Sequence, residues 1–217
     1  MERDEKLTSK VIKYGKRIGV DLIGFADPAH YGRFPEYNQP VFYLEGAQTV
    51  IILGFHLQDI ILDAWNVNQQ TGKNYHFADL ILEKFCNLVR DFLTKQGHDS
   101  EIIPYTPGLF LKDSAALAGL GPIGKNNLLI TEQFSSQVRL RALTTTAPLV
   151  CGTPIIESEY CKECNICVES CPAGAFPDGK YSKEICQPYQ LSHLKKLSKG
   201  TSIWCNICIE SCPIGKK

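Results

Sequence analysis

The spacing of the cysteines constrains this chain more than any other feature. Seven of the ten cysteines in the 217-residue sequence fall in two short runs, and Cys186 lies alone between them. The runs are Cys161-x2-Cys164-x2-Cys167-x3-Cys171-Pro172 and Cys205-x2-Cys208-x3-Cys212-Pro213. Three thiolates spaced by two residues wrap one face of a [4Fe-4S] cubane, whereas the cysteine before proline ligates the other cluster of a pair. The spacing therefore predicts two [4Fe-4S] clusters.

The second run has no cysteine at its expected first place, which Ser202 occupies. Cys186 is the substitute that the sequence offers, because a loop and helix of moderate length return its thiolate to the same iron. The predicted ligand sets are Cys161, Cys164, Cys167 and Cys212 for one cluster, and Cys171, Cys186, Cys205 and Cys208 for the other.

Zinc binding and disulfide bonds are the two alternative uses of these cysteines. Zinc sites are built from paired C-x2-C elements and have no use for a third cysteine two residues later or for a Cys-Pro. A disulfide framework suits a short secreted chain, whereas this sequence opens without a charged and then apolar leader. Cys86 lies in an apolar helical pattern and is expected in a core, while the role of Cys151 stays open.

Length and composition indicate two domains. We expect a cofactor-binding domain at residues 1–152 and a two-cluster domain at residues 153–217, because the composition shifts to Cys, Glu and Lys after Thr153-Pro154. So small a second domain buries little apolar surface, and the clusters are expected to supply much of its folding free energy.

Charge and hydropathy exclude several classes of partner. The formal net charge is zero, so no global field favours a nucleic-acid backbone. No apolar run approaches the roughly 20 residues that span a bilayer, and no lipidation signal is present. We expect a soluble, cytoplasmic protein with no membrane segment.

The apolar pattern mixes helices and strands without a β-α-β repeat, which predicts an α+β fold with a mainly antiparallel sheet. Helices are expected at residues 5–20, 75–96 and 112–120. Strands are expected at residues 21–26, 50–55, 102–103, 127–131 and 138–143. The strand at residues 138–143 alternates, so Arg139 and Arg141 face one way, toward solvent or toward an anionic ligand.

The glycine motif from Ala118 to Asn126 is the best candidate for a cofactor contact. Closely spaced glycines let backbone N–H groups approach a ligand, and Lys125 supplies a cation for a phosphate or carboxylate. The alternative is a helix cap and turn without a ligand. A Rossmann nucleotide or a nucleoside triphosphate is not favoured, since neither G-x-G-x-x-G after the first strand nor a P-loop occurs.

Taken together, Tyr75-His76 at a predicted helix start, the Ala118–Asn126 segment, Leu128-Leu-Ile-Thr131 and the two-cluster module with Cys186 resemble the epoxyqueuosine reductase family. These are cobalamin-dependent iron–sulfur enzymes related to reductive dehalogenases. The resemblance implies a nitroreductase-like core that binds a corrinoid, followed by a ferredoxin-like module that reduces its cobalt. The residues that it places near the corrinoid are Tyr75, His76, Gly121, Gly124, Lys125 and Asn126.

Two departures from the family pattern bear on the substrate. Members that act on tRNA continue with a helical-repeat domain, whereas this sequence ends at Lys217, so tRNA is not expected as a partner. The family also carries an acidic proton donor upstream of the glycine motif, where this sequence reads Pro104 to Gly108 without a carboxylate. Tyr105 and the displaced Asp113 are the candidate catalytic residues, although an unperturbed phenol is a poor acid at neutral pH.

Three functions are therefore compatible with the sequence. The first is an oxidoreductase whose two clusters carry electrons from a donor such as ferredoxin or flavodoxin to a corrinoid, for reduction of a small substrate or reductive activation of a corrinoid. The second is a related reductase with FMN in place of the corrinoid. The third is an electron-transfer protein whose N-terminal domain only docks a partner.

Overall fold

The computed structural model describes residues 2–68 and 70–215, which form two compact units. Unit 1 comprises Met1–Phe55, Ile81–Pro122 and Leu140–Ile156, and unit 2 comprises His56–Leu80, Ile123–Arg139 and Glu157–Lys217. Each unit therefore contains segments that are far apart in the sequence, because residues 56–80 and 123–139 contact the cysteine-rich segment. The domain boundary expected at residue 152 stays a prediction.

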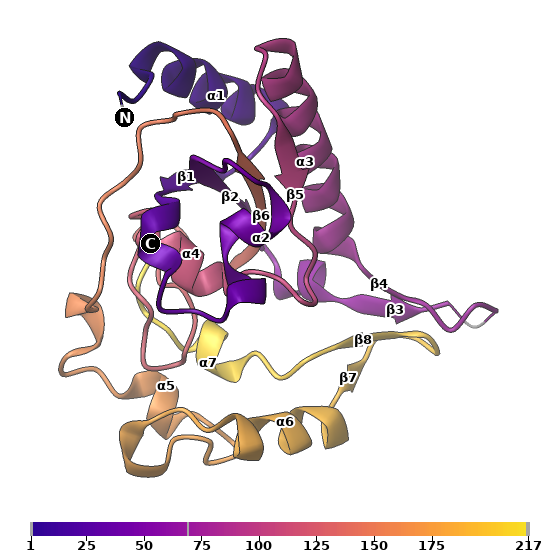
Figure 1. Ribbon diagram of the computed structural model, residues 1–217. Coiled ribbons are helices and arrows are strands. Elements are labelled where there is room, and N and C mark those ends of the chain that lie inside the picture. Colours follow the sequence, from indigo (N-terminus) through magenta and orange to yellow (C-terminus); the bar gives the residue numbers. More distant parts are fainter. Residues whose placement is uncertain (1, 69, 216–217) are drawn as a thin grey trace. The chain divides into compact units, whose positions relative to one another are not determined.

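Unit 1 is built on a four-stranded sheet in the order β1-β2-β6-β5 (Figure 1). Its strands are β1 (Leu22–Ala26), β2 (Thr49–His56), β6 (Val138–Thr145) and β5 (Ser100–Ile102). The helices that accompany it are α1 (Glu5–Ile18), α2 (Pro40–Tyr43), α3 (Phe77–Lys95) and α4 (Leu111–Leu117), with the short 3-10 helices η1 (Pro28–Tyr31) and η2 (Glu36–Asn38). Strand β1 pairs antiparallel with β2, and β5 pairs antiparallel with β6.

Helix α1 begins and ends where its sequence places caps. The side chain of Asp4 accepts a hydrogen bond from the backbone N–H of Leu7 at 2.8 Å, which satisfies a free donor of the first turn. Gly19 ends the helix at φ 96°, a left-handed conformation that costs glycine little. Leu7 and Val11 are buried on one face of the helix. The predicted opening helix is confirmed.

Both faces of the unit 1 sheet are covered. On one face Ile51 and Leu53 pack in a buried cluster with residues of α1 and α3, among them Val11 and Leu82. Side chains alternate along a strand, so Gly24 faces the other way from its neighbours, toward α4, which contacts β1. A methyl group at Gly24 would lie 2.7 Å from Cγ of Leu120. Burial on both faces explains the continuous apolar run of the central strand β2.

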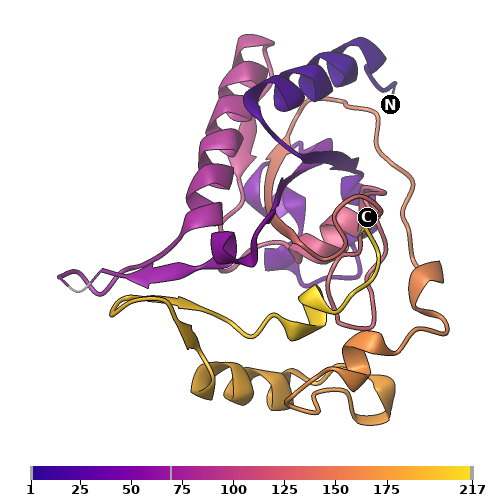
Figure 2. The same cartoon turned by 180° about the vertical axis from the view of Figure 1, so that it is seen from behind.

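Unit 2 has its own four-stranded sheet, in the order β4-β3-β8-β7. Strands β3 (Trp65–Val67) and β4 (Asn74–His76) form a hairpin, and β3 also pairs antiparallel with β8 (Thr201–Ile203), the yellow strand beside the purple hairpin in Figure 2. Strand β7 (Lys195–Lys196) pairs with β8. The helices of unit 2 are α5 (Ile166–Glu169), α6 (Lys183–Ser192) and α7 (Ile207–Glu210), with the 3-10 helices η3 (Ile60–Asp63), η4 (Glu159–Cys161) and η5 (Pro177–Gly179).

The predicted α+β class with antiparallel sheets is confirmed, whereas the nitroreductase-like core and the ferredoxin-like module stay predictions. Two local predictions are wrong. Tyr75 and His76 close strand β4 instead of opening the helix, which begins at Phe77. Residues 127–131 make only isolated bridges, since Asn127 at φ 60° breaks the extended run. No helix in the described part of the chain is long and apolar enough to cross a membrane.

Replacing Gly152 by alanine should destabilise unit 1. A Cβ atom there would lie 2.1 Å from the backbone oxygen of Ala118, so backbone must move, and the free energy of unfolding should fall by about 1–3 kcal/mol. The matched control is Gly32→Ala, whose Cβ meets nothing within 4 Å and should change stability by less than about 0.5 kcal/mol. Urea unfolding followed by circular dichroism measures both, and equal midpoints for the two variants would contradict the prediction.

Candidate metal centre

Eight cysteines of unit 2 gather into two neighbourhoods. The first is a cavity lined by Cys161, Cys164, Cys167 and Cys212, the four residues of the first predicted set. The pKa of the Cys167 thiol is raised by its burial and by the nearby thiols of Cys161, Cys212 and Cys164. Three of these cysteines come from η4, α5 and the loop between them, and the fourth follows α7. The fold therefore joins sulfur atoms from both cysteine runs.

The second neighbourhood surrounds Cys208. Burial, together with the nearby thiols of Cys205, Cys167, Cys186 and Cys171, raises the pKa of the Cys208 thiol to about 12. Apart from Cys167, these are the residues of the second predicted set. In residues 2–68 and 70–215 no three or more His, Cys, Asp or Glu side chains are placed to hold a single metal ion. The ligand sets themselves stay a prediction.

The two Cys-Pro segments are near-copies in sequence and in structure. Residues 164–172 read CNICVESCP and residues 205–213 read CNICIESCP, so they differ only at Val168 and Ile209. Helices α5 and α7 contact each other, and each begins after an asparagine whose carbonyl accepts the N–H groups of the third and fourth residues that follow. Equivalent cysteines therefore occupy equivalent places in the two copies.

The place of Ser202 explains why the second run lacks a local fourth ligand. Ser202 lies in strand β8, is 8% exposed and pairs with Trp65 of β3 and Lys196 of β7. Cys186 is instead carried by helix α6, close to Tyr181. Burial and a hydrogen bond with Cys186 raise the pKa of Tyr181, so its phenol stays protonated and can donate toward sulfur.

Lys125 contacts the loop of the first set. Its ammonium donates to the backbone oxygen atoms of Cys164 at 3.0 Å and Lys162 at 3.4 Å, and to Oδ1 of Asn165 at 2.8 Å. Lys125 is half-buried and also lines the cavity of the four cysteines. The structure therefore gives the lysine of the glycine motif a place beside the cysteines, and its expected contact with a corrinoid stays a prediction.

Gly124 and Asn126 are fixed in the same segment of unit 2. Asn126 is 4% exposed, and its Nδ2 donates to Oγ of Ser136 at 2.9 Å and, more weakly, to the backbone oxygen of Cys208 at 3.5 Å. A Cβ atom at Gly124 would lie 2.7 Å from Cγ1 of Ile130. The motif thus needs its glycine and its asparagine for packing and loop contacts, whether or not they also touch a ligand.

His76 belongs to a group of charged side chains in unit 2. Arg139, expected to face solvent or a ligand, donates to Oδ1 of Asp79 at 2.8 Å and to Oδ1 of Asp63 at 3.2 Å. Burial lowers the pKa of His76, and Arg139 lowers it further. Nδ1 of His76 is buried with no hydrogen-bond partner in the described part of the chain, whereas the adjacent Tyr75 is 38% exposed.

A stacked pair of tryptophans in unit 2 was not predicted from the sequence. Trp65 stacks on Trp204 with ring centroids 5.4 Å apart, and Trp204 directly precedes Cys205. Nε1 of Trp65 is buried and, like Nδ1 of His76, has no partner among the described residues. The available signal was composition, since the chain contains only these two tryptophans.

The remaining candidates, Gly121, Tyr105 and Asp113, lie in unit 1. Gly121 has φ 156°. The guanidinium carbon of Arg141 lies 4.0 Å from the ring centroid of Tyr105, and Asp113 pairs with Arg33 at 3.8 Å. Each candidate proton donor therefore has an arginine neighbour. Their catalytic roles stay predictions.

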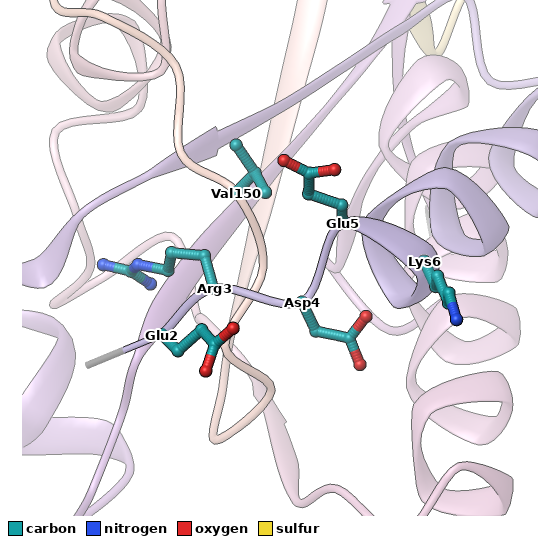
Figure 3. A pocket seen from close by; sticks show the side chains of 6 residues that line it. All are labelled: Glu2, Arg3, Asp4, Glu5, Lys6 and Val150. Atoms are coloured by element: carbon teal, nitrogen blue, oxygen red, sulfur yellow. The ribbon is translucent and has the colours of Figure 1, made fainter.

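A surface hollow of unit 1, shown in Figure 3, is formed by the start of the chain and Val150. Arg3 anchors this segment, because its guanidinium donates to the backbone oxygen of Gln48 at 2.7 Å and pairs with Asp27. The side chains drawn in Figure 3 point in different directions. They do not converge on a common point, so this hollow is not a candidate site.

Two cysteines lie in unit 1, outside both sets. Cys86 is fully buried, as predicted, and burial raises the pKa of its thiol to about 12. Cys151 is half-buried, which also raises the pKa of its thiol. Neither cysteine belongs to a predicted ligand set.

In the folded protein Cys86 should resist alkylation. The thiolate is the nucleophile, and a thiol with a pKa near 12 is ionised to only about one part in ten thousand at pH 8. We expect iodoacetamide to label Cys151 faster than Cys86 in buffer, and both at similar rates in denaturant, as measured by peptide mass spectrometry. Equal labelling of the two residues in buffer would be inconsistent with this core.

Comparison with known proteins tests the family resemblance that the sequence motifs indicate. A curated epoxyqueuosine reductase from Listeria monocytogenes is 35% identical over 215 residues, which cover 84% of this chain and 56% of that protein. The chain spans about half the length of the curated relatives it matches, for example 53% of the epoxyqueuosine reductase of Bacillus anthracis. No family model matches the chain.

Solved structures give the same fold. An epoxyqueuosine reductase with an epoxyqueuosine-modified tRNA stem loop matches with a TM-score of 0.71 at 22% identity, over 97% of this chain and 65% of that one. A reductive dehalogenase studied for the mechanism of B12-dependent dehalogenation also gives 0.71, at 16% identity, over 95% of this chain and 32% of that one. The resemblance read from the motifs is confirmed, because the chain is similar to curated epoxyqueuosine reductases over most of its own length and shares the fold of their solved structures.

Proposed function

We propose that this chain is an iron–sulfur oxidoreductase that passes electrons through two [4Fe-4S] clusters to a corrinoid. The observation that carries the proposal is the gathering of eight cysteines of unit 2 into two neighbourhoods that match the two sets expected from spacing. The electrons would come from an external donor such as ferredoxin or flavodoxin. The final acceptor would be a small molecule or a second corrinoid.

The cysteine neighbourhoods fit cubane clusters. Each set holds the four thiols that a [4Fe-4S] cluster needs, and the first set lines a cavity with Lys125 and Asn126 at its edge. In the second set, the backbone N–H of Ala175 lies 3.4 Å from Sγ of Cys171, the kind of contact that tunes cluster potentials. When bound, the clusters accept and release single electrons. The eight cysteines would hold them.

Support for a corrinoid comes from the relatives and from unsatisfied polar atoms. The reductive dehalogenase that shares this fold performs a B12-dependent reaction. In unit 2, Nδ1 of His76 and Nε1 of Trp65 are buried without partners among the described residues, and such atoms are commonly satisfied by a ligand or water. We place Tyr75, His76, Gly124, Lys125 and Asn126 of unit 2 at the corrinoid.

The charges around His76 suit a neutral side chain. A lowered pKa leaves the imidazole uncharged near pH 7, so one ring nitrogen donates and the other accepts a hydrogen bond. The carboxylates of Asp79 and Asp63, both paired with Arg139, raise the pKa of His76, but burial and the Arg139 charge outweigh them. His76 can therefore position a polar group of a bound ligand without adding charge.

Single cysteine variants test the two ligand sets. Cys161→Ser and Cys186→Ser should each lose about half of the iron and sulfide after anaerobic reconstitution, because each removes a ligand of one cluster out of two. Cys151→Ser is the matched control and should keep the full content. Iron analysis and electron paramagnetic resonance measure the result. Full iron content in Cys186→Ser, with loss in Cys151→Ser, would refute the assignment.

Cobalamin binding tests the corrinoid. Reconstituted protein should change the visible spectrum of added cobalamin under anaerobic conditions, and His76→Phe should weaken binding about tenfold, since one buried hydrogen bond is worth about 1 kcal/mol or more. His30→Gln changes an exposed histidine and should bind like the wild type. An unchanged cobalamin spectrum would contradict the proposed corrinoid. FMN retained by the purified protein would favour the flavin alternative.

A further inference from the structure

The near-copies at residues 164–172 and 205–213 allow the surroundings of the two clusters to be compared within one molecule. Their sequences differ by one methylene group, Val168 against Ile209. Their backbones repeat as well, since Asn165 and Asn206 precede equivalent helices with nearly the same dihedral angles, φ −123° and ψ 10° against φ −128° and ψ 13°. Differences between the two environments must therefore come from residues outside the copies.

Lys125 is such a difference. Its ammonium reaches the first copy, where it donates to the backbone oxygen of Cys164 at 3.0 Å and to Oδ1 of Asn165 at 2.8 Å. In the second copy the equivalent Asn206 has its Nδ2 buried with no hydrogen-bond partner in the described residues. Lys125 thus binds the side-chain oxygen of Asn165 in the first copy, whereas in the second copy the side-chain nitrogen of Asn206 lacks a partner among the described residues.

Nearby carboxylates do not cancel this charge. Glu163 and Glu169 are exposed and border an outer hollow of the surface, and Glu159 pairs with the exposed Lys162 at 2.7 Å. Exposed charges are screened by water and salt. Lys125, by contrast, is half-buried and is the charged amino group among the described residues that line the cysteine cavity.

We propose that Lys125 sets the potentials of the two clusters apart by raising the reduction potential of the cluster in the first set. Reduction adds one negative charge to a [4Fe-4S] cluster, and a fixed ammonium beside it stabilises that charge more strongly in a partly buried site than in water. The external donor is oxidised by one electron and the first cluster is reduced by one, with no bond made or broken. The inference rests on the proposed iron–sulfur function.

This asymmetry gives electron transfer a direction. The second set, Cys171, Cys186, Cys205 and Cys208, becomes the lower-potential neighbour, so an electron arriving there is held more favourably in the first set. Two copies in identical surroundings would share the electron equally. Lys125 thus has a role in addition to holding the Cys164 loop.

The test compares two variants of Lys125. Lys125→Gln removes the charge but keeps a side-chain donor, whereas Lys125→Arg keeps the charge. Anaerobically reconstituted proteins are titrated potentiometrically and followed by electron paramagnetic resonance, without corrinoid. We expect the higher of the two midpoint potentials to fall in Lys125→Gln, the lower one to stay, and both to stay in Lys125→Arg. Unchanged potentials, or equal shifts of both, would overturn the proposal.

A second measurement covers the case in which Lys125→Gln fails to keep its clusters. Cys161→Ser should remove or alter the higher-potential signal of otherwise wild-type protein, and Cys186→Ser the lower-potential signal. The reverse assignment would overturn the role of Lys125. Protein that assembles no cluster contradicts the proposed function, whereas loaded protein with the wrong order of potentials contradicts only this inference.

Discussion

The crowding of thiols is the interaction on which unit 2 depends. Burial and neighbouring sulfur atoms raise the pKa of the Cys167 and Cys208 thiols, so bringing these groups together as thiolates is costly without a cation. Binding of the proposed clusters would reverse this cost, because metal ligands deprotonate as the metal binds and the site folds around it. The cysteine-rich segment has few buried apolar residues that could stabilise it in place of a metal. It is instead held by partners from elsewhere in the chain: strand β3 pairs with β8, and Lys125 holds the loop of Cys164.

Unit 1 is stabilised in a different way. Its sheet is buried on both faces, and Ile51, Leu53 and Leu82 are fully buried in a single apolar cluster. Close packing makes this unit sensitive to added atoms, as the backbone contact beneath Gly152 illustrates. The two residues predicted as proton donors, Tyr105 and Asp113, lie in this unit with arginine neighbours. We therefore expect the two units to respond to different perturbations, unit 1 to changes in core volume and unit 2 to loss of the proposed clusters.

What could be predicted from sequence was encoded locally. Helix α1 has both its caps within a few residues of its apolar stripe, and the closely spaced Cys161, Cys164 and Cys167 line one cavity. The errors involve partners far apart in sequence. Tyr75 extends in β4 because β3 is paired with a strand more than a hundred residues later. The arginine pattern of β6 gave no sign that Asp63 and Asp79 would surround Arg139. Periodicity reports which face of an element is apolar, and it carries no information on which distant charge will meet that face.

The missing cysteine of the second run shows how these distant contacts bear on function. A ligand at residue 202 would have to turn toward iron, whereas Ser202 is held in β8 between Trp65 and Lys196. Strand β8 pairs with β3, and β3 pairs with β4. Strand β4 contains Tyr75 and His76, the proposed corrinoid contacts of unit 2. The proposed use of Cys186 of α6 as a ligand leaves residue 202 free to take part in this sheet. Strand β8 thus accounts both for the serine at residue 202 and for the placement of His76. The surroundings of the two cysteine copies differ at Ser202, beside the second copy, and at Lys125, which contacts the first.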